Sequence, residues 1–377
     1  MTQTAERPAP ADAPARGSHY MHGLDVLRVI CSVAVLYNHV AGWAKMRGAG
    51  EFWIADLIEG GVVDSLHLNE LLGFVGVGTF LVISGVVVTH VSTRETPGQF
   101  LARRAVRLFP ALWVAILLAW VLALTGVLGV NHPPDFGDLL LNLGLLNYSV
   151  ADASTLLAVT WTLTVQVVFY LLAAVTIPLL KRWPWLPPAI AAALVSVLIS
   201  FTNNPTEGGP ASLRIIASFL PVLFLGQLVM LVRGKRLAPL PAIALGLVHL
   251  WLAARAAATW SGTPDGPAYV RTLVLILLLL LLCTRANGRI ARSRVIKVLA
   301  DRTYAVYLLH FAVVLGTLNL LADPLGFWPA LGIGLTVLAV TTELLHRFVE
   351  RPLARGFRRW EARRAERKRE FTRSSDR

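Results

Sequence analysis

The chain has 377 residues, of which 55% are hydrophobic and 15% charged, whereas soluble domains average about 45–50% and about 25%. These proportions exclude an ordinary water-soluble globule, and the apolar residues lie in long blocks rather than in amphipathic stripes. A net charge of +13 would suggest nucleic acid as the partner of a soluble protein, but in a membrane protein it reflects topology. Two cysteines in apolar stretches exclude a disulfide framework. We predict an all-α, membrane-embedded protein that binds no nucleic acid.

Long apolar blocks recur along the chain. A helix that crosses a bilayer core of about 30 Å needs about 20 apolar residues, and ten blocks reach or approach that length. The fifth and the eighth are the shortest. We therefore predict ten membrane-spanning helices, over residues 24–44, 71–91, 108–130, 159–180, 186–202, 213–232, 237–258, 269–284, 304–322 and 328–348.

The Lys and Arg residues are divided unevenly between the two sides of these spans. The two tails and the loops after the even-numbered spans hold 29 of the 35, and cytoplasmic segments of membrane proteins retain such residues. Both termini are accordingly predicted to be cytoplasmic, in a multi-pass protein of the cell membrane. We divide the chain into a disordered tail (1–21), a transmembrane domain (22–356) and a basic cytoplasmic tail (357–377).

The first span carries two groups that are costly in hydrocarbon, Arg28 and His39. They are 11 residues apart, which leaves about 20° between them around a helix and about 16 Å along it. Their shared face is predicted to meet other helices or a cavity rather than lipid. A structural interpretation stays open, in which Arg28 pairs with Asp25 and His39 bonds to a neighbouring carbonyl.

The second and third spans meet at a polar segment. In the second span, GVGTFLVISGVVVTH, the glycines permit close helix packing, or Ser84 and Gly85 leave room for a substrate. At the mouth of the third span stand Arg103, Arg104 and Arg107. Topology alone explains arginines there, yet Arg104 and Arg107, three positions apart, also form a patch suited to phosphate oxygens. A nucleotide-bearing donor on the cytoplasmic side would use such a patch.

Further polar groups occur in the fourth and ninth spans. TWTLTVQVVFYLL offers Trp161, Gln166 and Tyr170, and TYAVYLLH offers Tyr307 and His310 on one side of a helix. Packed aromatic rings and a hydrogen-bonded imidazole would explain them structurally. They are also candidates for contacting a substrate within the membrane. No metal site is expected, because the histidines are scattered without metal-binding spacing.

Six segments in this order resemble motifs of membrane acyltransferase family 3, the ten-span O-acyltransferases of surface polysaccharides and glycosylated natural products. They are GLDVLRVICSVAVLYNHV, FLVISG, RRAVRLFP, WTLTVQVVFYLL, TYAVYLLH and VERP, and the resemblance covers residues 22–356. It implies that Arg28 and His39 are the family's first-span pair and that His39 is essential. It also implies that Arg104 and Arg107 serve an acyl-CoA donor.

The chain departs from the family pattern at two positions. The family usually has Glu where this chain has Gln166, and Ser where it has Thr303, whereas Ser84 and Gly85 match the family's Ser-Gly motif. Glutamine accepts no proton at neutral pH. The resemblance therefore implies either another carboxylate, for which Glu343 is the candidate, or a slow or altered reaction.

Together these features predict an O-acyltransferase that moves an acyl group, most simply acetyl, from acyl-CoA to a hydroxyl group. The acceptor would be a carbohydrate, a glycolipid or a glycosylated small molecule, and no bound cofactor is expected. His39 would act as general base, because a neutral imidazole is matched to proton transfer near pH 7. Arg28 would stabilise negative charge on the reacting carbonyl or hold the donor. The alternative is a non-enzymatic transporter or exporter of lipid or acyl groups, which accounts equally well for His and Arg within spans.

Overall fold

The computed structural model describes residues 20–48, 52–202, 211–259 and 266–375, and every regular element in these residues is helical. These helical elements follow one another along the chain. They are α1 (His22–Met46), α2 (Trp53–Ile58), a π-helical turn (Glu59–Val63), α3 (Asp64–Leu66), a 3-10 turn (Glu70–Leu72), α4 (Gly73–Ser92), α5 (Pro97–Leu124), α6 (Phe136–Leu143), a 3-10 turn (Ala158–Thr160), α7 (Trp161–Arg182), α8 (Leu186–Thr202), α9 (Ala211–Arg233), α10 (Pro239–Thr259), α11 (Gly266–Arg285), α12 (Arg294–Ala300), α13 (Thr303–His310), a π-helical turn (Phe311–Leu315), α14 (Gly316–Leu325), α15 (Phe327–Leu345), a π-helical turn (His346–Glu350) and α16 (Arg351–Ser375).

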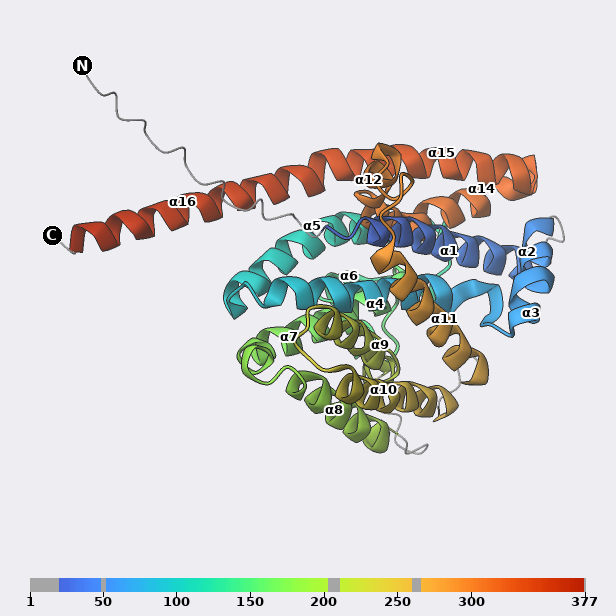
Figure 1. The fold of residues 1–377 in the computed structure, drawn as a ribbon. Coiled ribbons are helices and arrows are strands. Elements are labelled where there is room, and N and C mark those ends of the chain that lie inside the picture. Colours follow the sequence, from blue (N-terminus) through green and yellow to red (C-terminus); the bar gives the residue numbers. More distant parts are fainter. Residues whose placement is uncertain (1–19, 49–51, 203–210, 260–265, 376–377) are drawn as a thin grey trace, which may run out of the picture.

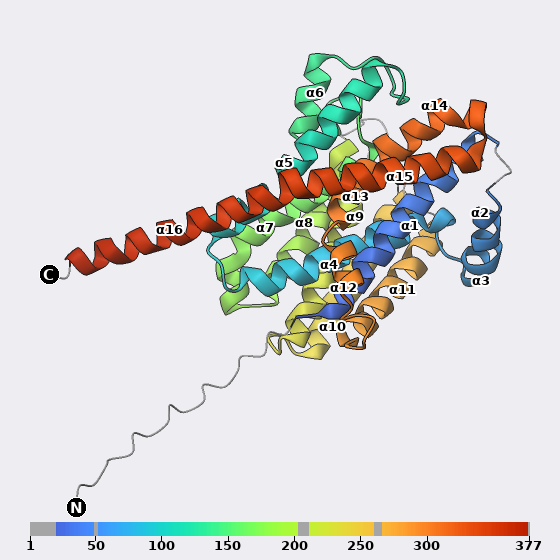
Figure 2. The same ribbon diagram turned by 90° about the horizontal axis from the view of Figure 1, so that it is seen from above.

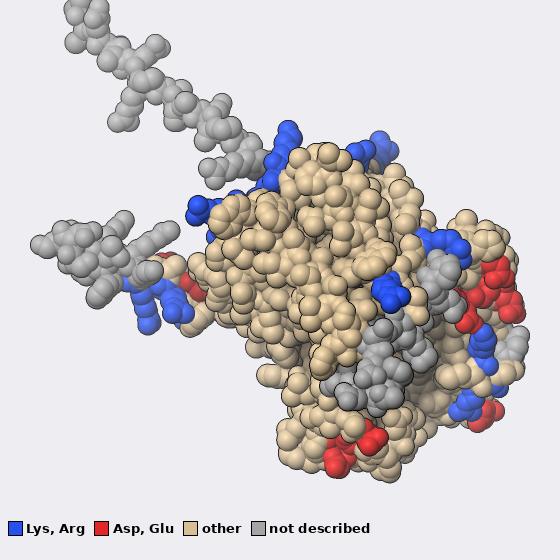
Figure 3. All heavy atoms as spheres, turned by 90° about the horizontal axis from the view of Figure 1, so that it is seen from below, with Lys and Arg blue, Asp and Glu red and all other residues tan. Residues whose placement is uncertain are grey.

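Nine helices of the described residues are long and apolar enough to cross a membrane, and α8 is a shorter apolar helix. Together they correspond to the ten predicted spans, with α13 and α14 joined through a π-helical turn into one of them. The prediction of an all-α polytopic membrane protein is confirmed. Figure 3 shows an extensive uncharged surface on one face, with most of the charged side chains near its edges, as expected where helices contact lipid. Residues 1–19 of the predicted disordered tail lie outside the described residues.

The third predicted span was placed wrongly at both ends. Helix α5 begins eleven residues earlier, at Pro97, because the Thr96 side chain accepts a hydrogen bond from the Gln99 backbone and Gln99 reciprocates. It ends at Leu124, and Gly126 adopts a positive φ of 76° in the following turn. The arginines that were expected at the mouth of this span therefore lie within the first turns of α5.

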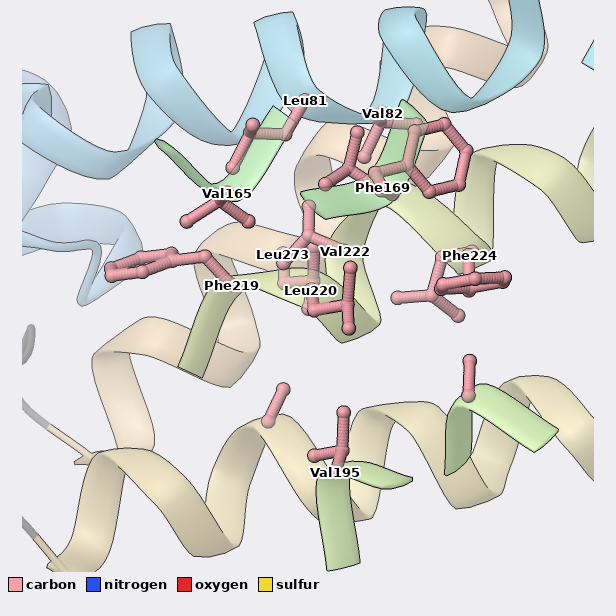
Figure 4. Close-up of a cluster of buried hydrophobic side chains, with 14 of the residues drawn as sticks. Leu81, Val82, Val165, Phe169, Val195, Phe219, Leu220, Val222, Phe224 and Leu273 are labelled. Carbon is pink, nitrogen blue, oxygen red and sulfur yellow. The ribbon is translucent and has the colours of Figure 1, made fainter. Parts of the chain in front are cut away.

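Helices α4 and α9 approach each other closely through two glycines. A Cβ atom added to Gly85 would lie 2.0 Å from the Leu223 carbonyl oxygen, and one added to Gly226 would lie 2.1 Å from that of Val82. Only glycine permits such an approach, as in other membrane helix pairs. Around this contact, apolar side chains of α4, α7, α8, α9 and α11 fill the core, as Figure 4 shows.

A second apolar core joins α1, α5, α13 and α15. Helix α16 continues α15 and projects beyond the other helices in both ribbon views (Figures 1 and 2). It therefore runs through the predicted domain boundary at residue 356 without a break. Arg103 of α5 bonds Glu361 of α16 at 3.0 Å, which attaches the projecting helix to the bundle. Helices α2 and α3 lie near the C-terminal end of α1 (Figure 2).

Candidate active site

A recess opens at the end of the bundle where α1, α5 and α13 begin and α4 ends. It encloses about 600 Å³ of empty space, its open mouth included. Five helices contribute to its wall, and none of the described residues that line it carries a carboxylate. The lining residues are Arg28, Phe80, Ile83, Ser84, Val87, Val88, Arg104, Arg107, Leu108, Gln166, Tyr170, Thr303 and Tyr304.

Arg28 is anchored on the α1 side of this recess. Its guanidinium lies 3.2 Å from a carboxylate oxygen of Asp25, whose residue is 3% exposed. The Tyr20 hydroxyl donates to the other carboxylate oxygen at 2.6 Å, and burial together with this bond raises the pKa of Tyr20. Arg28 thus pairs with Asp25, as the structural interpretation allows, and also lines the recess.

The three clustered arginines of α5 separate into two groups. Arg104 and Arg107 line the recess, and the Arg104 Nε is buried without a hydrogen-bond partner among the described residues. Arg103 points elsewhere, because it bonds Glu95 at 2.7 Å and Glu361 at 3.0 Å. Arg28, Arg104 and Arg107 therefore form a cationic surface, whereas Arg103 joins α5 to α16. The structure does not bring Arg103 into the predicted donor site.

A hydrogen-bonded row crosses the recess between α4 and α7. The Gln166 amide nitrogen donates to Ser84 Oγ at 2.9 Å and to Tyr170 Oη at 2.7 Å, and its amide oxygen is buried without a partner in the described structure. Tyr170 lies within electrostatic reach of all three recess arginines. Gly85, next to Ser84, does not line the recess, because it faces the α9 backbone.

His39 lies outside the recess, next to a second histidine. The ring centroids of His39 and His310 are 5.1 Å apart, and the Phe311 ring is 5.4 Å from that of His39. His310 Nδ1 lies 2.8 Å from the Tyr307 carbonyl oxygen, which can only accept, so Nδ1 carries the proton. His310 Nε2 is buried without a partner in the described part of the chain. A π-helical turn, a feature frequent at functional sites, follows directly (Phe311–Leu315).

Aromatic side chains connect the recess to this histidine pair. Phe80 lines the recess and stacks on Tyr307 with centroids 5.5 Å apart, and Tyr307 lies 5.9 Å from His310. Phe80 was not among the predicted site residues, although its place one turn before Ser84 puts it on the same face of α4. Arg28 and His39 thus occupy two ends of one packed path rather than a single pocket.

Two other predicted residues, Trp161 and Tyr307, make contacts that explain them as structural side chains. Trp161 packs on Phe219 at 4.4 Å between centroids and does not line the recess. The Tyr307 hydroxyl bonds Thr162 Oγ1 at 2.5 Å and donates to the Val159 carbonyl at 2.8 Å.

Glu343, the candidate for another carboxylate, lies outside the recess. Its carboxylate bonds Arg302 at 2.5 Å and also bonds Arg347, and it does not line the recess. Its two arginine partners therefore fix it in a network outside the recess. No group of three or more His, Cys, Asp or Glu in the described ranges is arranged to hold a metal ion.

Comparison with known proteins gives two relatives. The nodulation protein 10 of Rhizobium leguminosarum bv. viciae is 25% identical over 332 residues, covering 79% of this chain and 84% of the relative. The exopolysaccharide production protein ExoZ of Rhizobium meliloti (strain 1021) is 26% identical over 259 residues, covering 64% and 77%. No solved structure matches the chain. A family model described as an acyltransferase domain matches residues 21–345, and the chain belongs to this family of membrane acyltransferases.

Proposed function

We propose that the protein is an integral-membrane O-acyltransferase that moves an acyl group, most simply acetyl, from acyl-CoA to a hydroxyl of a carbohydrate, glycolipid or glycosylated natural product. The observation that carries the proposal is the convergence of Arg28, Arg104 and Arg107 on a recess that no carboxylate lines. Guanidinium groups bind phosphate oxygens through paired hydrogen bonds, and CoA supplies several phosphates. The recess is thus suited to the donor.

The reaction proposed at His39 is a direct transfer. His39 removes the proton of the acceptor hydroxyl, the oxygen attacks the thioester carbonyl carbon, the carbon–sulfur bond breaks, and the proton passes from His39 to the departing thiolate. Arg28 lies with the other two arginines in the recess, about 16 Å along α1 from His39, which supports its donor-holding role. To bridge this separation, the long pantetheine arm of CoA would have to displace the stacked rings of Phe80 and Tyr307.

His310 has a positioning role in this scheme. Because its Nδ1 donates to a backbone carbonyl, its Nε2 is left as an acceptor beside His39. A hydrogen bond from His39 to this nitrogen would fix the tautomer of His39 and leave its other nitrogen free to take the acceptor proton. The structural setting of His310 favours this role over direct contact with the donor.

One relative, the exopolysaccharide production protein ExoZ, supports a carbohydrate acceptor by its name. The division of Lys and Arg between the two sides supports a cell membrane location with both termini cytoplasmic. The recess would then open to the cytoplasm, where acyl-CoA is present.

The test is turnover of acetyl-CoA by purified protein in lipid nanodiscs, with and without glycans and lipids extracted from the host. We expect CoA release that depends on the acceptor and is lost in His39→Ala. His249→Ala is the matched control, because this buried histidine bonds the Pro188 carbonyl at 3.0 Å, away from the recess. Retained turnover in folded His39→Ala would refute the general-base role. Absence of turnover in the wild type with every acceptor fraction would refute the proposal.

A further inference from the structure

A second, apolar groove lies between α9, α10 and α11, away from the recess. It encloses about 1170 Å³ of empty space, its open side included. Hydrocarbon side chains of all three helices form its wall. They include Leu228, Val229, Ile243, Leu247, Leu277 and Leu281.

The groove is open because α10 presents small residues at its centre. Gly246 lies on the wall, and a Cβ atom added there would meet only Leu225, at 3.8 Å. Ile243 and Leu247 beside it are 59% and 61% exposed. Within a bilayer such a groove is filled by hydrocarbon rather than water, because water gains no hydrogen bonds from an apolar wall.

Two arginines stand at one end of the groove. Arg233 is the last residue of α9 and Arg285 the last of α11, and α10 begins at that same end with Pro239. Both arginines line the groove and are exposed. Neither forms a hydrogen bond, ion pair or ring contact with the described residues. The groove therefore combines a hydrocarbon channel with two uncompensated positive charges at the depth of the membrane surface.

We propose that this groove is a binding site for one anionic phospholipid. An acyl chain lies along the hydrocarbon wall, and the headgroup phosphate accepts hydrogen bonds from Arg233 and Arg285. Positive charge at helix ends attracts anionic lipid in general. The adjoining groove holds one acyl chain of the lipid. The arginines and the groove together therefore form a specific lipid-binding site.

The experiment is native mass spectrometry of the full chain in detergent, titrated separately with phosphatidylglycerol and phosphatidylcholine. The double variant Arg233→Gln/Arg285→Gln removes the charges, and Gly246→Leu fills the groove without changing charge. Arg289→Gln/Arg292→Gln is the matched control, because these exposed arginines precede α12 near the same end and do not line the groove. Size-exclusion profiles identify variants that fail to fold.

We expect the wild type to retain phosphatidylglycerol in preference to phosphatidylcholine. Loss of both groove arginines should weaken phosphatidylglycerol binding at least about tenfold, because each donates charge-assisted hydrogen bonds to the phosphate, and Gly246→Leu should weaken binding of both lipids. The control pair, whose exposed charges lie outside the groove, should leave the affinity within about twofold of the wild type. Equal losses in the two double variants would show general surface attraction only, and unchanged binding in folded Gly246→Leu would show that the groove holds no lipid. Either result overturns the proposal.

Discussion

Replacing Gln166 with glutamate should stabilise the protein and weaken its binding of CoA. The side chain is 4% exposed and lies on the recess wall, where its nitrogen donates to the hydroxyls of Ser84 and Tyr170. Both hydroxyls can rotate and donate to a carboxylate instead, so the substitution preserves the two hydrogen bonds. The new charge would be the first carboxylate among the described residues that line the recess.

The expected changes in stability and in CoA affinity follow from two buried polar atoms that lack hydrogen-bond partners in the described structure of the wild type. Arg104 Nε and the Gln166 amide oxygen are both buried without a hydrogen-bond partner in the described structure. A hydrogen bond to a charged group contributes about 1.5–3 kcal/mol. The carboxylate should therefore raise the free energy of unfolding by at most about that amount, because the cost of burying the new charge opposes the gain. It should also compete with the CoA phosphates and weaken CoA binding about tenfold, taking the lower value.

The assay is equilibrium binding of CoA together with thermal unfolding in the same detergent. Binding is preferred to turnover because a glutamate at this position could also change the chemistry. Gln166→Met is the control, since it removes the two hydrogen bonds without adding charge and should lower the unfolding temperature. If Gln166→Glu matches the wild type in both CoA affinity and unfolding temperature, the arginines do not act on this position and the reasoning fails.

Three further substitutions test the structural roles assigned above. Gly85→Ala should destabilise the protein by about 1–3 kcal/mol, because the methyl group would collide with the Leu223 carbonyl; an unchanged unfolding temperature would contradict the α4–α9 contact. Tyr307→Phe should cost about 0.5–1.5 kcal/mol by removing the hydrogen bonds of its hydroxyl, while Thr162 and the Val159 carbonyl stay bonded to each other, and an undiminished denaturation midpoint would argue against those bonds. Glu343→Gln should lower stability, with CoA affinity in the folded fraction unchanged; a parallel loss of affinity would mean that this carboxylate acts on the recess after all.

The spans could be predicted because each depends on a local property, a run of apolar residues long enough for a bilayer. The ends of α5 could not be predicted in the same way. Its first turns contain three arginines that interrupt the apolar run, and the boundary is set by a hydrogen-bonding residue, Thr96. Hydropathy therefore locates a membrane helix better than it locates the point where that helix begins.

The sequence predicted the candidate site only where the residues involved lie on a single helix. Arg104 and Arg107 were expected to act together from their spacing on α5, and both line the recess. Arg103 could not be separated from them by sequence, because its partner Glu361 lies 258 residues away. The contact of His39 with His310 likewise joins two distant helices. Such pairings depend on how the helices pack, which no local pattern encodes.

The central claim is that the arginine recess binds the acyl donor, and the most direct measurement is the affinity of purified protein for acetyl-CoA in nanodiscs. Arg104→Gln is compared with Arg103→Gln, which removes the same charge from a neighbouring residue that does not line the recess. Loss of a charge-assisted hydrogen bond worth about 1.5–3 kcal/mol predicts at least about tenfold weaker binding for Arg104→Gln. Arg103→Gln should bind within about twofold of the wild type. Equal affinities for the two variants would contradict the account.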